Sequence, residues 1–140
     1  MKDAAYWKEC EQLMNTLPKN INVVYHGELS PADLATAMQK FQLFIMPSKS
    51  ENFGHALLEA LSAGKPVITT NTTPFKNLQH AKAGYTVNIN QLDADLPVAI
   101  AEFAAMSKNE FDEYGNAAKA FGANFVDTIL IKQQYQTLFT

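Results

Sequence analysis

The chain has 140 residues, enough for one domain with a hydrophobic core but few for a complete two-domain enzyme. Its net charge of −3 and its lack of a basic run exclude a nucleic-acid partner, because binding to a phosphate backbone needs clustered positive charge. The single cysteine, Cys10, excludes a disulfide framework. No apolar stretch could span a bilayer and no signal peptide opens the chain, so we expect a cytoplasmic protein with residues 1–140 as one domain.

The first 47 residues are predicted to fold as helix, strand, helix and strand. Apolar residues recur every three or four positions over residues 3–17, which indicates an amphipathic helix. A strand over residues 22–27 follows. The next helix has Ser30 as its N-cap and Pro31 at its first position, and it runs to about Phe41.

The middle of the chain is predicted to form one βαβ unit. An apolar strand over residues 43–46 ends at Pro47, which lacks the N–H that a strand ladder needs. Strong helix formers then fill residues 55–63, and Gly64 provides a left-handed cap. A β-branched run over residues 67–70 forms the next strand.

The second half continues the alternation of strands and helices. We expect a short helix over residues 75–82, a strand over 85–89 and covering helices over 96–107, 109–121 and 124–138. Four strands separated by helices imply an open parallel α/β sheet. Ligands bind at the C-terminal edge of such a sheet, where the loops after its strands meet.

Two glutamates and a glycine mark the loop and helix that follow the strand ending at Met46. Glu51 ends the loop, Gly54 lies at the mouth of the helix, and Glu59 is about two turns inside it. Helix N-terminal amides are unpaired and favour anions, and Gly54 allows a diphosphate to approach the backbone. The sequence therefore predicts a phosphate site between two carboxylates that can accept hydrogen bonds from sugar hydroxyls.

These residues resemble the E-x7-E motif of retaining glycosyltransferases of the two-domain GT-B type, particularly glycosyltransferase family four. The surrounding frame is similar too: PS-x-x-E-x-F-G begins at Pro47, and E-A-x-x-x-G-x-P-V begins at Glu59. Val23, Tyr25 and Gly27 stand where the family has V-x-F-x-G. The resemblance implies the C-terminal, donor-binding half of a GT-B enzyme. Its fold would be a Rossmann-like open parallel sheet with helices on both faces, incomplete at its N-terminus.

The resemblance also implies an activity and a role for each site residue. The enzyme would be a hexosyltransferase-type enzyme of glycan biosynthesis that moves a sugar from a nucleotide-diphosphate sugar to a hydroxyl acceptor. Glu51 would be the catalytic residue at the sugar hydroxyls, and Glu59 would bind the ribose. The donor phosphates would contact the backbone amides of Phe53, Gly54, His55 and Ala56, and the nucleobase would lie near His26 and Gly27.

No metal or other cofactor is expected. Asp93-Ala94-Asp95 spells the D-x-D that binds a metal in other glycosyltransferase folds, but here it precedes a helix, where a first-turn acid is the simpler interpretation. The three histidines, His26, His55 and His80, lack the spacing of a metal site.

Two departures from the family pattern bear on function. Relatives often carry a Gly-Gly pair after the strand that here ends at Thr70, whereas this chain has Thr72-Thr73-Pro74. Relatives also have two further strands, with an Arg and a Lys that grip the donor phosphates, and an N-terminal acceptor domain. We expect this chain to be inactive without those parts, to bind an upstream acceptor domain or another subunit, and to have a tendency to self-associate. Peripheral attachment to a membrane would go through the missing half.

Two other functions stay open from the sequence. One is a non-catalytic module or subunit that binds a nucleotide sugar without turnover. The other is a flavodoxin-like regulatory domain with no sugar ligand. Binding of UDP or GDP would exclude the second, and sugar transfer by the chain with its partner would exclude the first.

Overall fold

The computed structural model describes residues 3–138. It consists of two compact units that divide between Pro31 and Ala32, and each is described by itself. The expectation of a single domain over residues 1–140 therefore stays a prediction.

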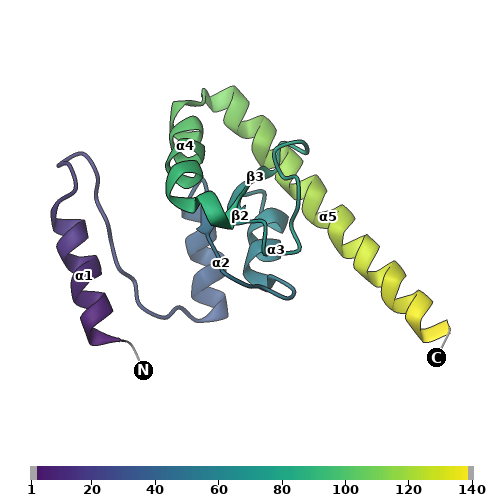
Figure 1. The fold of residues 1–140 in the computed structure, drawn as a ribbon. Coiled ribbons are helices and arrows are strands. Elements are labelled where there is room, and N and C mark those ends of the chain that lie inside the picture. The colour runs from purple at the N-terminus through teal and green to yellow at the C-terminus, as the bar shows by residue number, and fades with distance from the viewer. Residues whose placement is uncertain (1–2, 139–140) are drawn as a thin grey trace. The chain divides into compact units, whose positions relative to one another are not determined.

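The first unit contains helix α1 (Ala4–Asn15) and a long loop (Figure 1). The helix begins where predicted because Asp3 is its N-cap, and the Asp3 side chain accepts hydrogen bonds from the N–H groups of Ala5 and Tyr6. The rings of Trp7 and Tyr25 lie 4.5 Å apart and attach the loop to the helix.

The predicted strand over residues 22–27 is wrong, because this segment is a loop. A strand is stable only beside a neighbour that completes its backbone hydrogen bonds, and the described part of the first unit contains no other strand. Its apolar side chains are exposed accordingly, with 59% of Val24 open to solvent.

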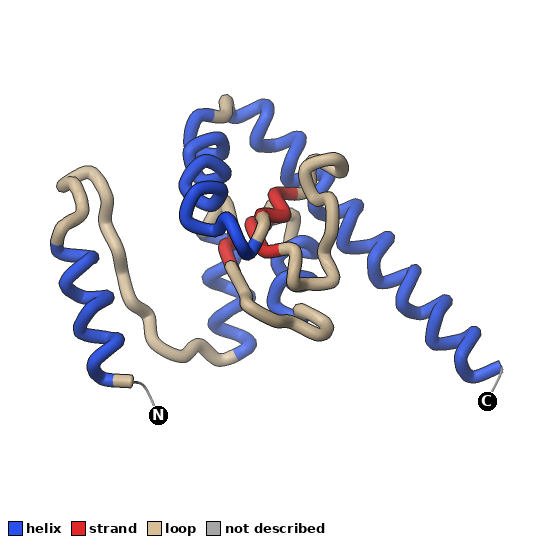
Figure 2. The backbone as a smooth tube through the Cα atoms, viewed as in Figure 1, coloured by secondary structure: helices blue, strands red, loops and turns tan. Residues whose placement is uncertain are grey.

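The second unit is a three-stranded parallel sheet with helices around it. Its elements in chain order are α2 (Pro31–Lys40), β1 (Phe44–Met46), α3 (His55–Ser62), β2 (Val67–Thr70), β3 (Gly84–Val87), the 3-10 turn η1 (Ile89–Gln91), α4 (Leu92–Ala105) and α5 (Lys108–Leu138). The strand order is β1-β2-β3, with Phe44 opposite Val67 and Val67 opposite Gly84 (Figure 2). The predicted open parallel α/β sheet is confirmed.

Strand β2 lies at the centre and is buried on both faces, which explains its unbroken β-branched run. Val67 belongs to one apolar cluster with residues of α2, α3 and α5. The next residue, Ile68, points to the opposite face and packs with Ala99 and Phe103 of α4. Helices therefore cover both faces of the sheet, as predicted (Figure 1).

The predicted helix over residues 75–82 is wrong, because turns fill this segment. Asn77 and Lys82 have φ angles of 55° and 53°, in the left-handed region that a right-handed helix excludes. The turns place Gln79 beside β3, where its side-chain amide donates to the Thr86 carbonyl at 2.9 Å and accepts from the Thr86 N–H at 3.1 Å. Gln79 thus takes the place of a neighbouring strand at the outer edge of β3.

The two predicted C-terminal helices are a single helix, α5, which continues through Gly122. A Cβ atom at Gly122 would lie 3.2 Å from the backbone nitrogen of Ser62, so this glycine allows α5 to pack closely against α3. The helix supports the site described below, because its residues Phe121 and Phe125 contact Phe75 in the loop after β2, and Phe125 also contacts Phe53 in the loop before α3.

Candidate functional site

The loop between β1 and α3 carries the predicted site. It ends at Gly54, which is the N-cap of α3 and has a φ angle of 75°. The Glu51 carboxylate reaches over the end of the loop, and its Oε1 accepts a hydrogen bond from the Gly54 N–H at 3.2 Å. Glu51 is half-buried, so one of its oxygens fixes the loop.

The N-terminus of α3 has no side-chain cap, because the N-cap residue is a glycine. The first-turn amides of His55 and Ala56 carry the positive end of the helix dipole. The His55 side chain is exposed and its ring lies 4.3 Å from the half-buried ring of Phe53. Phe53, Gly54, His55 and Ala56 are thus contiguous around one helix N-terminus, and such a terminus can bind an anion.

Glu59 lies on the exposed side of α3. Within residues 3–138 its carboxylate makes no hydrogen bond or ion pair, so it has no structural task that the described residues reveal. Glu51 and Glu59 therefore differ: the first is tied to the loop, and the second is free to bind a ligand.

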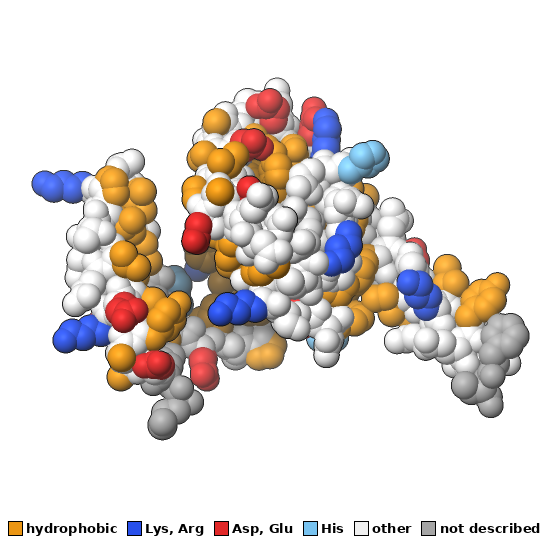
Figure 3. Space-filling view, viewed as in Figure 1, with side chains coloured by type: hydrophobic (Ala, Val, Ile, Leu, Met, Phe, Trp, Pro, Cys, Tyr) orange, Lys and Arg blue, Asp and Glu red, His pale blue; other side chains and the backbone are white. Residues whose placement is uncertain are grey.

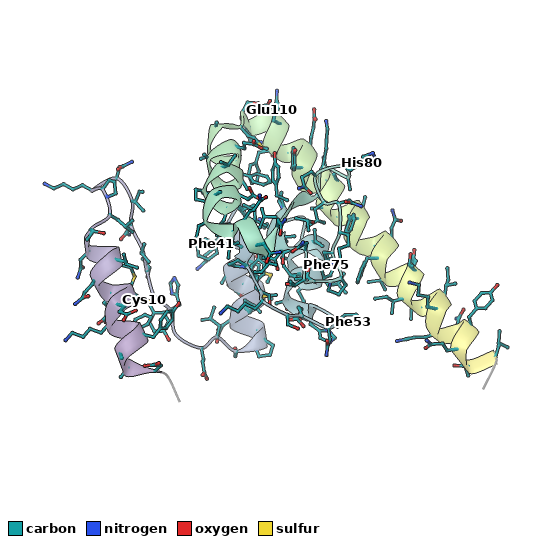
Figure 4. All side chains as sticks on the ribbon, viewed as in Figure 1. Cys10, Phe41, Phe53, Phe75, His80 and Glu110 are labelled. Carbon is teal, nitrogen blue, oxygen red and sulfur yellow. The ribbon has the colours of Figure 1, made fainter. Side chains whose placement is uncertain are left out.

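The structure shows a second reason for a glycine at position 54, which the sequence did not suggest. A Cβ atom here would lie 2.7 Å from Cε2 of Phe75, which is fully buried. The Phe75 ring stacks on Phe125 of α5 at 4.5 Å, and Phe53 lies nearby (Figure 4). The glycine is therefore needed for packing beneath the loop, in addition to any contact with a diphosphate.

Sequence reasoning missed the residues that hold the other end of this loop. The Ser48 carbonyl accepts hydrogen bonds from the hydroxyls of Thr70 and Thr72, the latter at 2.7 Å. Thr70 is the last residue of β2 and is fully buried, and Thr72 lies in the loop that follows the strand. In the sequence, the only feature that could have indicated these two residues is the threonine-rich run that begins at Thr69.

His26 and Gly27 lie in the first unit, and both are exposed. The other predicted site residues lie in the second unit. Because each unit is described by itself, the predicted place of His26 and Gly27 near a nucleobase stays a prediction.

A shallow hollow of about 700 Å³ opens beside the loop. Lys49 lines it from the loop, and residues 89–94 line it from η1 and the start of α4. Asp95 lies in the first turn of α4, as the sequence predicted, and Asp93 lies there too because the helix begins at Leu92. No group of three or more His, Cys, Asp or Glu side chains in residues 3–138 is placed to hold a metal ion.

Positive charge does not gather on the face drawn in Figure 3, where the lysine side chains within each unit are separated by other side chains. None of the helices in residues 3–138 combines the length and the apolar character that crossing a membrane requires.

Residues 4–121 match the family model described as glycosyl transferases group 1. The chain belongs to this family. Over its whole length the fold is also similar to that of sucrose-phosphate synthase from Thermosynechococcus elongatus, a GT-B structure, with a TM-score of 0.69 and 23% identity. The match covers 99% of this chain and 36% of that one.

Three curated relatives match the chain at 29% to 31% identity. The chain is 31% identical over 90 residues to sulfoquinovosyl transferase SQD2 of Arabidopsis thaliana, which covers 61% of the chain and 17% of the relative. It is 29% identical over 109 residues to a GDP-mannose-dependent alpha-mannosyltransferase of Mycolicibacterium smegmatis, which covers 77% and 27%. A GDP-mannose:cellobiosyl-diphosphopolyprenol alpha-mannosyltransferase of Xanthomonas oryzae is 31% identical over 97 residues, covering 69% and 25%. The chain thus spans about a quarter or less of the relatives it matches.

Proposed function

We propose that this chain is the donor-binding part of a retaining hexosyltransferase that uses a nucleotide-diphosphate sugar. The observation that carries the proposal is the N-terminus of α3, which has no side-chain cap and lies between Glu51 and Glu59. Membership of the glycosyl transferases group 1 supports the reaction class. The acceptor would bind to an upstream part of the protein or to another subunit.

The geometry suggests how the site would act on the donor. The bond between the anomeric carbon and the diphosphate oxygen breaks, and its electron pair leaves with the nucleoside diphosphate. The amides at the α3 N-terminus would stabilise that negative charge. The acceptor hydroxyl forms the new bond to the anomeric carbon on the same face of the sugar, and its proton passes to the departing diphosphate oxygen.

Glu51 fits the sugar side of this reaction. Its Oε1 is held by the Gly54 N–H, and Oε2 has no partner in residues 3–138. The held oxygen fixes the orientation of the carboxylate, so the other can accept a hydrogen bond from a sugar hydroxyl. Glu59 would bind the ribose, and no metal is required.

The names of the relatives suggest which donor to test first. Two of them are named for GDP-mannose, and a third is named for sulfoquinovosyl transfer. GDP-mannose is therefore our first choice of donor and UDP-sugars are the second.

The test is the affinity of the Glu59→Ala variant for GDP, measured by calorimetry. We expect a loss of about 1 to 3 kcal/mol, because a carboxylate that accepts two hydroxyl hydrogen bonds is removed. The fold should be unchanged, because Glu59 is exposed. Glu113→Ala on α5 is the matched control, since this exposed glutamate makes only a surface ion pair to Lys82 at 3.5 Å.

Equal GDP and UDP affinities for Glu59→Ala and the parent would remove Glu59 from the site. Absence of any nucleotide binding by the parent would contradict the donor-binding proposal. A chain that binds nucleotide sugars but supports no transfer when supplied with its upstream partner would be a non-catalytic module.

A further inference from the structure

The loop after β2, called the β2 loop below, carries Thr72-Thr73-Pro74. The Thr72 hydroxyl donates to the Ser48 carbonyl at 2.7 Å, across 24 positions of sequence. The hydroxyls of Thr70 and Thr72 are themselves 2.7 Å apart. Ser48 is thereby fixed to the end of β2.

The same β2 loop supports the other end of the loop that carries Glu51. The buried Thr73 hydroxyl donates to the Thr70 carbonyl at 3.1 Å and accepts from the Phe75 N–H at 3.3 Å. The Phe75 carbonyl accepts from the Thr86 hydroxyl at 2.9 Å. These bonds fix Phe75, whose ring lies directly beneath Gly54.

The two supports enclose the segment from Ser48 to Gly54, which contains Glu51. Contacts with other segments of the chain run through the Ser48 carbonyl, which the Thr70 and Thr72 hydroxyls share, and through ring packing of Phe53 on Phe125 and of Phe75 beneath Gly54. The bond from Gly54 to Glu51 is internal. The position of the Glu51 carboxylate therefore depends on the β2 loop. The network is fully buried at Thr70 and Thr73 and partly buried at Ser48 and Thr72, and several connected bonds hold a geometry more strictly than one bond would.

We propose that Thr72 is a positioning residue for Glu51, acting through the Ser48 carbonyl. The proposal rests on the proposed function for its effect on the sugar, but the effect on the loop is independent of any ligand. Thr72 touches no substrate in this scheme. It holds the segment whose carboxylate, that of Glu51, contacts the sugar.

The experiment compares Thr72→Val, which keeps the shape and removes the hydroxyl, with Thr72→Ser, which keeps the hydroxyl. Thr36→Val is the matched control, because Thr36 on α2 is exposed and its hydroxyl bonds only within its own helix, to the Ala32 carbonyl. If Thr72→Val folds poorly, Thr72→Ala replaces it.

The first measurement is hydrogen exchange of the 140-residue chain without ligand. We expect amides of residues 48–54 to exchange about threefold to tenfold faster in Thr72→Val, in line with the loss of one hydrogen bond, and parent rates in Thr72→Ser and Thr36→Val. Unchanged exchange in this segment for Thr72→Val, or no recovery in Thr72→Ser, would overturn the proposal.

The second measurement is affinity for GDP and for GDP-mannose. Thr72→Val should weaken GDP-mannose more than GDP, because Glu51 contacts the sugar and the helix amides contact the diphosphate. An equal loss for both ligands would show a general structural effect and overturn the positioning role. If the parent binds neither ligand, the proposed function fails, and hydrogen exchange alone decides whether Thr72 fixes the loop.

Discussion

Gly54 shows how one residue can serve both packing and binding. Its φ angle of 75° is in the left-handed region, where a side chain is strained, and its Cα faces the buried ring of Phe75. The sequence suggested only that a diphosphate must approach closely. A substitution at this position therefore tests the fold before it tests the ligand.

We predict that Gly54→Ala destabilises the chain more than Gly64→Ala, measured by urea unfolding. Both positions have a similar positive φ, at 75° and 73°, so each variant should lose about 1 to 2 kcal/mol from backbone strain. A Cβ at Gly64 meets only the Gly115 carbonyl at 3.4 Å, an ordinary contact, whereas a Cβ at Gly54 overlaps Phe75. The overlap should add about 1 to 3 kcal/mol.

Equal destabilisation of the two variants would mean that Phe75 moves aside without cost. In that case a loss of nucleotide affinity in Gly54→Ala would report on the amide site directly.

At the scale of secondary-structure elements, the start of α5 offers a test by pH. Ser107 and Glu110 form a capping box, in which the Ser107 N–H donates to Glu110 Oε2 at 2.7 Å and the Glu110 N–H donates to Ser107 Oγ at 3.3 Å. The backbone hydrogen bond from Ser107 lowers the pKa of the Glu110 carboxyl below its usual 4.5. The charged form is therefore favoured by folding.

We predict that Glu110 stabilises α5 above pH 4.5, and that this contribution disappears as the pH falls through the lowered pKa of the folded state. Thermal unfolding of the parent and of Glu110→Gln checks this as a function of pH. The parent should have the higher midpoint at neutral pH, and the two midpoints should converge in acid. A difference between the midpoints that persists in strong acid would show that the charge of Glu110 is not responsible.

The elements that the sequence predicted correctly have local causes. Asp3 caps α1, Pro31 starts α2, and Pro47 ends β1, each through its own backbone or side-chain chemistry. The predictions that were wrong concern segments whose structure depends on contacts with residues elsewhere in the chain. The segment 22–27 has strand composition but no neighbouring strand, and Gln79 bonds to Thr86 in place of continuing a helix.

The same division applies to the candidate site. The frame from Pro47 to Glu59 predicted the loop and the start of α3, and the roles of Glu51 and Glu59 stay predictions. The supports beneath it could not be predicted, because Thr72 bonds to Ser48 across 24 positions and Phe75 meets Gly54 through ring packing. Sequence spacing contains no information on such contacts.

At the scale of the whole molecule, the chain spans only part of the length of its relatives, and this leads to a prediction about its activity. We expect the 140-residue chain to bind nucleoside diphosphates weakly and to transfer no sugar when tested alone. Transfer requires both substrates in attack geometry, and positioning of that kind is worth effective molarities of about 10⁵ M or more. Under the proposed function, the described residues would contact the donor only.

Incubation with UDP-, GDP- and ADP-sugars and simple sugar acceptors, followed by mass spectrometry, checks this expectation. Turnover at enzyme-like rates that Glu51→Ala abolishes would show that the chain carries a complete active site.

The Gln79 amide on the outer edge of β3 limits how copies of this chain can assemble. A sheet with two free edges can add a copy at each side and grow without end into filaments. Here Gln79 takes both outward backbone groups of Thr86 at the middle of β3, and the other edge of the described sheet is that of β1, three residues long and followed by Pro47. Self-association through the described sheet should therefore use the β1 edge and close at a pair, because Gln79 interrupts the edge from which a fibre would have to propagate.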